Sequence, residues 1–122
     1  MDAAPDPSDR SRYVPVPFDV TVDRVGPWTI VRPEGEIDLA TVGRVAQAAG
    51  GAAADLAIDL RAVTFLDSSG LRFLIEQDHR ARDAGHAFAI VPGDASIQRL
   101  LQIAGLDTRL RVLEDGDATA GD

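Results

Sequence analysis

The chain has 122 residues, 45% of them hydrophobic and 26% charged, which is the balance of one soluble globular domain with its own core. Its formal net charge is -8, and an acidic surface does not suit a phosphate-backbone ligand, so we expect no direct nucleic-acid partner. The absence of cysteine excludes disulfides and thiolate metal sites, and two histidines offer little for any other metal centre, so no cofactor is expected.

Both ends of the chain differ in composition from its middle. Residues 1–17 hold four of the seven prolines and are predicted to form a flexible arm. Residues 114–122 hold four acids and no base, and are predicted to form a disordered acidic tail. The folded domain is expected over residues 18–113. No segment has the apolar length of a signal peptide or a membrane span, so we expect a cytoplasmic protein with no membrane partner.

The first regular element is a predicted hairpin. Hydrophobic side chains at Phe18, Val20 and Val22 alternate with polar ones, which is the period of a half-buried strand. The segment WTIVR at 28–32 is rich in strand-forming residues, and Gly26-Pro27 marks the turn before it. The second strand is expected to end where PEGEID begins.

A helix is predicted to follow the hairpin. Asp38 is a good N-cap, and the helix is expected to run to about Ala49 and to stop at the glycine pair 50–51. The apolar positions at helical spacing, which should face the core, are Leu39, Val42, Ala46 and Ala49. The mostly apolar segment LAIDL at 56–60 then predicts a strand in the centre of the sheet.

A second helix is predicted from about Ser69 to Ala84, with Gly85 at its end. Leu71, Leu74 and Ile75 share one stripe of this helix, and Asp78 interrupts that stripe, as expected of a helix tilted towards solvent. Three more elements are predicted beyond it: a strand at 87–91, a helix from Asp94 to Gly105, and an edge strand at 109–113.

This order of elements predicts an α/β fold. Strand-helix-strand units require parallel pairing and right-handed crossovers, whereas the opening hairpin is antiparallel. We therefore expect one domain with a mixed sheet of four to five strands and about three packed helices.

The segment DSSG at 67–70 stands at the junction between a hydrophobic run and a helix. Asp67 or Ser68 would accept a hydrogen bond from a free helical N–H, and Gly70 would let the backbone pass close to a neighbour. One cap satisfies such a junction, so at least one hydroxyl is left without a structural role.

Two functions for that hydroxyl can be compared. A catalytic serine needs a base within hydrogen-bond reach, and His79 lies about 15 Å along the same helix from Ser69, so we expect no enzyme. Neither a G-x-S-x-G elbow nor a glycine-rich phosphate loop is present. A phosphorylated serine suits this position better than a catalytic one. A phosphate on the first helical turn would meet free N–H groups, and this contact would stabilise the fold locally by roughly 0.3–1 kcal/mol. It would also add about -1.5 to -2 charge to an acidic surface.

The segment VTFLDSSGL at 63–71, together with GEID at 35–38, resembles the STAS domain of bacterial anti-sigma factor antagonists. The resemblance covers residues 18–113 in the order and spacing of elements. It implies a cytoplasmic protein without catalysis of its own. The unphosphorylated antagonist binds an anti-sigma factor that is also a serine kinase, which frees the sigma factor for transcription.

The resemblance also implies a set of site residues and a second partner. The kinase inactivates the antagonist by phosphorylating Ser69, and a PP2C-type phosphatase reverses this modification. Asp38, Asp67, Ser68 and Gly70, with Ser69 itself, would form the surface that binds the partner. The chemistry of the junction does not choose between the two serines.

Two other functions remain open. A STAS scaffold in a lipid-transport ATPase or a stress-signalling complex would use the serines only as caps. A small anionic ligand would also suit a helix N-terminus, although no nucleotide motif supports one.

Overall fold

The computed structural model describes residues 17–52 and 54–114. The predicted arm covers residues 1–17 and the predicted tail covers residues 114–122; all but residue 17 of the arm and residue 114 of the tail lie outside the described residues. The described elements are, in chain order, β1 (Asp19–Val25), β2 (Trp28–Ile37), α1 (Val42–Gly50), β3 (Asp55–Asp59), β4 (Val63–Leu66), α2 (Ser68–Ala84), β5 (Phe88–Val91), α3 (Ala95–Ile103) and β6 (Arg111–Val112).

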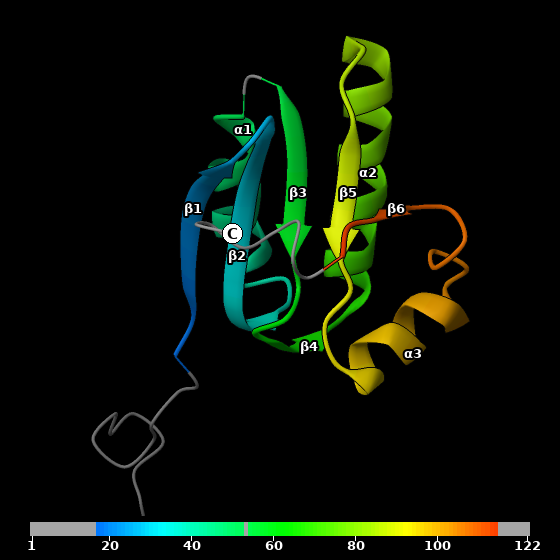
Figure 1. The fold of residues 1–122 in the computed structure, drawn as a ribbon. Coiled ribbons are helices and arrows are strands. Elements are labelled where there is room, and N and C mark those ends of the chain that lie inside the picture. The colour runs from blue at the N-terminus through cyan, green and yellow to red at the C-terminus, as the bar shows by residue number, and fades with distance from the viewer. Residues whose placement is uncertain (1–16, 53, 115–122) are drawn as a thin grey trace, which may run out of the picture.

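The strands form one mixed six-stranded sheet in the order β1-β2-β3-β5-β6, with β4 paired to β2 off this path (Figure 1). The β1–β2 hairpin is antiparallel, and every other pair is parallel. The predicted α/β fold, with its hairpin, mixed sheet and three helices, is confirmed. β4 was not expected, because its four residues were assigned to the connection before α2.

β2 is longer than the predicted strand, which was expected to end before Pro33. Trp28–Val31 pair with β3, and Gly35–Ile37 pair with β4, with a register shift at Gly35. Gly35 has a φ of 112°, and a Cβ there would lie 2.6 Å from the carbonyl oxygen of Pro17. Glycine thus allows a bend that moves the strand from one neighbour to the next instead of ending it.

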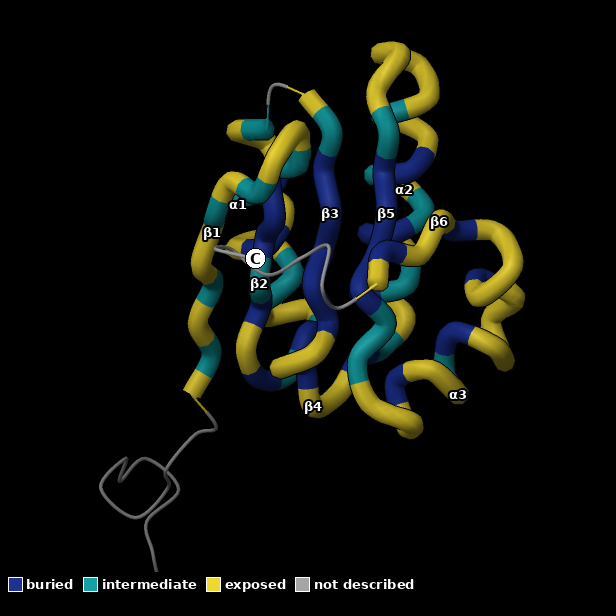
Figure 2. The backbone as a smooth tube through the Cα atoms, in the orientation of Figure 1, coloured by how far each residue is buried: buried dark blue, intermediate teal, exposed yellow. Residues whose placement is uncertain are grey.

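Helices α1 and α2 cover one face of the sheet (Figure 1). Strands β2, β3 and β5 are the most buried part of the chain, as Figure 2 shows in dark blue. The main core lies between this face and the helices, and includes Ile58, Phe73, Leu74 and Ile90. A second cluster on the other face contains Ile30, Ala57, Ala89, Val91 and Leu113. LAIDL is a central strand, as predicted, because β3 lies between β2 and β5.

Helix α1 begins at Val42 with Thr41 as N-cap residue, so the predicted start at Asp38 is wrong. The Asp38 side chain instead closes a turn, in which its Oδ1 accepts from the N–H of Ala40 at 2.9 Å and of Thr41 at 3.1 Å. The buried face of α1 also differs from the predicted one: Val45 and Ala49 are buried, whereas Ala46 is exposed. Leu39 lies in the turn and not in the core.

The interruption in the α2 stripe has a different cause from the expected one. Asp78 is buried rather than tilted towards solvent, and its Oδ2 accepts from Nε of Arg82 at 3.1 Å, one turn further along. This ion pair offsets the cost of removing the carboxylate from water. Gly85, with a φ of 76°, ends the helix as predicted.

Candidate functional site

The predicted junction is the short connection between β4 and α2. The two elements are separated by Asp67 alone, which has extended backbone angles and serves as N-cap of α2. Its Oδ1 accepts from the N–H of Ser69 at 2.8 Å and of Gly70 at 3.3 Å. Asp67 therefore satisfies two of the helix's free donors by itself.

Both serine hydroxyls are available because Asp67 makes the cap. Ser68 is exposed and Ser69 is half-buried. Neither hydroxyl has a hydrogen-bond partner in the part of the chain that the structure describes. Ser69 is thus partly exposed and not sealed in the interior.

The same cap changes the expectation for a phosphate at this position. The N–H groups of Ser69 and Gly70 already donate to Asp67, and the N–H of Leu71 donates to the Asp67 carbonyl at 3.0 Å. A phosphate on Ser69 would not meet these donors free, and it would lie next to a carboxylate. The local stabilisation expected from the sequence is therefore reduced.

Gly70 holds the first turn of α2 against the ends of two strands. A Cβ at this buried glycine would overlap Cδ1 of Leu66 and lie 3.1 Å from Cγ2 of Ile37. The absence of a side chain allows the helix to start this close to β2 and β4. Gly70 thus positions the two serines and does not itself present a surface to a partner.

Asp38 comes to the same edge of the sheet as Asp67. Ile37 and Leu66 are register partners at the ends of β2 and β4, and the N–H of Asp67 donates to the carbonyl of Ile37 at 3.1 Å. The structure therefore brings Asp38 beside DSSG across about thirty residues of sequence, as parallel strands do when they end together.

Two exposed apolar side chains flank this group, and neither was expected there. Leu39 is 81% exposed in the turn after β2, although the helical pattern assigned it to the core. Phe65 is 47% exposed on β4, a strand that was not predicted. No alternation in VTFL could have found it, because Val63 and Leu66 are both buried while Thr64 and Phe65 between them are both exposed.

The histidine of α2 lies away from the serines, towards the other end of the helix. His79 is exposed on α2, and its Nε2 lies 2.9 Å from Nη2 of Arg109. Among residues 17–52 and 54–114, no three acidic or histidine side chains could hold a metal ion together. No helix in these ranges has the length and apolar character to cross a bilayer.

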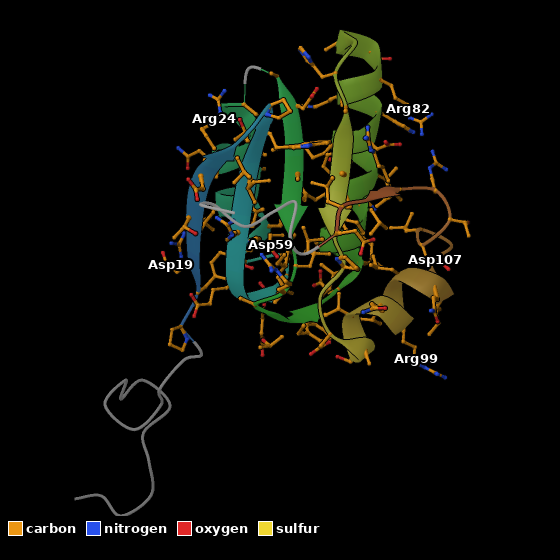
Figure 3. The ribbon with its side chains drawn as sticks, in the orientation of Figure 1. Asp19, Arg24, Asp59, Arg82, Arg99 and Asp107 are labelled. Atoms are coloured by element: carbon orange, nitrogen blue, oxygen red, sulfur yellow. The ribbon has the colours of Figure 1, made fainter. Side chains whose placement is uncertain are left out.

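A buried carboxylate lies on the other face of the sheet, at the end of β3 (Figure 3). Asp59 accepts from Nη2 of Arg61 at 2.7 Å and from Nε of Arg32 at 3.1 Å. Burial by itself would raise the pKa of Asp59, but hydrogen bonds from Arg61 and then Arg32 outweigh it, so the pKa is lowered. This cluster links β2 to the end of β3 and includes neither serine.

Comparison with known proteins gave one family and several solved structures. The family description "STAS domain" matches residues 19–116. A search of curated proteins gave no significant match. An anti-sigma factor antagonist from Mycobacterium paratuberculosis is 28% identical, with a TM-score of 0.68 over 79% of this chain and 85% of that chain.

Two structures of SpoIIAA also match, each at 17% identity over 82% of this chain. Unphosphorylated SpoIIAA, an anti-sigma factor antagonist, has a TM-score of 0.65 over 92% of its own chain. The phosphorylated form from Bacillus, described as a cell fate determinant, has a TM-score of 0.61 over 96% of its chain. At this identity the two structures support the fold alone.

Proposed function

Because this chain belongs to the STAS domain family, we propose that it is an anti-sigma factor antagonist. It binds an anti-sigma factor that is also a serine kinase, and this binding releases the sigma factor. The observation that carries the proposal is the junction itself: Asp67 caps α2, and the hydroxyls of Ser68 and Ser69 have no hydrogen-bond partner among the described residues. The 28% identical neighbour, described as an anti-sigma factor antagonist, supports the same assignment.

Ser69 is the proposed phosphorylation site. The choice of Ser69 over Ser68 follows the resemblance of DSSG to the family motif, since neither hydroxyl has a hydrogen-bond partner among the described residues. A PP2C-type phosphatase would return the protein to its active form. The protein itself would be cytoplasmic and carry out no catalysis, because its contribution is a surface whose charge changes.

A phosphate at Ser69 would weaken binding through charge. A kinase must bring the γ-phosphate of ATP to the serine Oγ, so the phosphoserine it forms faces the anionic ADP that remains. The modification adds about -1.5 to -2 charge beside Asp67. An uncompensated charge in an interface costs on the order of 3–5 kcal/mol. Because a tenfold change in the dissociation constant corresponds to about 1.4 kcal/mol, the affinity falls by roughly two to three and a half orders of magnitude.

The test begins with the kinase that the protein captures from a native extract in the absence of ATP. The purified pair is incubated with ATP, and the modified residue is mapped by mass spectrometry. We expect one phosphate on wild-type protein and on Ser68→Ala, and none on Ser69→Ala. Equal phosphorylation of Ser69→Ala would contradict the site. Recovery of a lipid-transport ATPase and no kinase would instead support the scaffold function.

A further inference from the structure

One arginine stands on the same stretch of α2 as the two serines. Arg72 is exposed, three residues after Ser69 and four after Ser68 in the same helix. Residues at these spacings are neighbours on a helix surface, with Cβ atoms about 5–6 Å apart. Helical side chains also point back towards the N-terminus, so a side chain at position 72 is directed towards the turn that carries both hydroxyls. The guanidinium is therefore within reach of a group attached to Ser69 Oγ.

The guanidinium of Arg72 is not committed to another acid in the unmodified protein. Within residues 17–52 and 54–114, Arg72 makes no hydrogen bond or ion pair, whereas Arg82 on the same helix is paired with Asp78 at 3.1 Å. Glu76, one turn after Arg72, is the acid that could compete for it. With the cation N-terminal to the anion, however, that is the weaker orientation of a helical pair. Arg72 is thus available to a new anion.

The other arginines near the serines in sequence are placed elsewhere in the fold. Arg61, before β4, binds Asp59 on the other face of the sheet, at 2.7 Å. Arg80, the next arginine on α2, lies about 12 Å beyond Arg72 along the helix axis. Of the arginines closest to the serines in sequence, Arg72 is the one that the helix places beside a phosphate on Ser69.

We propose that Arg72 binds the phosphate of phosphorylated Ser69 and so retains the protein in its modified form. This inference rests on the proposed phosphorylation of Ser69 and adds to it the residue that holds the product. The planar guanidinium donates two parallel N–H bonds to phosphate oxygens, which a phosphatase must break before it removes the group. One guanidinium does not neutralise a dianion, so an approaching partner still meets excess negative charge. Asp67 repels the phosphate that Arg72 attracts, which leaves little net change in the stability of the fold.

The size of the effect follows from the exposure of the pair. An exposed ion pair of single charges at helical spacing changes an equilibrium constant about twofold. Loss of the second phosphate proton, which ordinarily occurs near pH 6, adds one such charge. Arg72 should therefore lower the midpoint of this titration by about 0.3 pH unit, since that is a twofold change. Because the dianion binds more strongly than the monoanion, loss of Arg72 should speed dephosphorylation about two- to fourfold.

The test uses full-length protein in which phosphoserine is encoded at position 69 during translation, so that no kinase is needed. Arg72→Gln removes the charge, and Arg80→Gln is the matched control, because it removes an exposed arginine about 16 Å from Ser69 along the axis of α2. The phosphate is titrated by phosphorus NMR at low ionic strength, and its removal by alkaline phosphatase is timed.

We expect the titration midpoint of Arg72→Gln to lie about 0.3 pH unit above those of wild type and Arg80→Gln, and its phosphate to be removed about two- to fourfold faster. Arg72→Lys, which keeps the charge, should lie closer to wild type. Added salt should reduce the difference between wild type and Arg72→Gln. All variants should keep the wild-type circular dichroism spectrum, because the substituted side chains are exposed.

Distinct results would overturn the pair and the proposed function. If wild type and Arg72→Gln titrate at the same pH, Arg72 does not bind the phosphate, whatever the kinase does. If Arg80→Gln moves the midpoint as far as Arg72→Gln does, the effect is one of net charge, and the pair is again wrong. The proposed function fails separately, if the captured kinase leaves Ser69 unmodified while the encoded phosphate still titrates as expected.

Discussion

Replacing Asp67 with alanine should destabilise the fold, because the side chain makes the N-terminal cap of α2. The substitution removes the hydrogen bonds of 2.8 and 3.3 Å to the N–H groups of Ser69 and Gly70 and leaves both donors without their partner. The loss of an N-cap lowers the free energy of unfolding by about 0.5–2 kcal/mol. Because two N–H groups donate to the Asp67 side chain, we expect a loss in the upper part of that range, about 1–2 kcal/mol. For a domain of this size, that lowers Tm by about 4–8 °C for each kcal/mol.

Asp67→Asn is the matched variant, since asparagine caps helices as well as aspartate does but carries no charge. Urea denaturation at neutral pH should place Asp67→Asn near wild type and Asp67→Ala well below it. If the Asp67→Ala protein is as stable as wild type, the Asp67 side chain does not cap α2. The argument that this residue leaves both serine hydroxyls available would then fail.

Three further outcomes are expected from thermal or urea unfolding. Gly70→Val should cost about 1–3 kcal/mol, because its side chain overlaps Leu66 and approaches Ile37, and wild-type stability would contradict the close approach of α2. Phosphorylated protein should have almost the Tm of unmodified protein, since Asp67 already occupies the nearby N–H groups; a rise of several degrees would refute this. The pKa of Asp59 is lowered in the folded state, so its contribution is full above the unfolded pKa of about 3.9 and is lost as pH falls through the folded value. Stability should thus decline below about pH 4, and less so in Asp59→Asn.

Local signals in the sequence predicted the elements that depend on local chemistry. Alternation with Gly26-Pro27 predicted the hairpin, and Asp94 and Gly85 predicted helix ends that the structure confirms. These features depend on neighbouring residues alone. The DSSG junction was predicted for the same reason, since a cap and a flexible glycine are recognisable within four residues.

Features that depend on distant partners were missed. β4 is stable as a strand because β2 pairs with it, and β2 reaches it only through the bend at Gly35. The late start of α1 depends on Thr41 Oγ1, which donates to the carbonyl of Glu36 and so keeps Leu39 in a turn. The spacing of apolar residues in the sequence does not indicate whether residues 38–41 form a turn or the first turn of a helix. The exposure of Phe65 was missed because β4 was not predicted. The exposure of Leu39 was missed because α1 was predicted to start too early.

The affinity of this protein for its kinase, measured with and without a phosphate on Ser69, tests the central claim most directly. Both forms are titrated into the same purified kinase with ADP bound, after mass spectrometry has located the phosphate. We predict that the phosphorylated form binds roughly two to three and a half decades more weakly while its circular dichroism spectrum is unchanged. Equal affinities of the two forms would contradict the account.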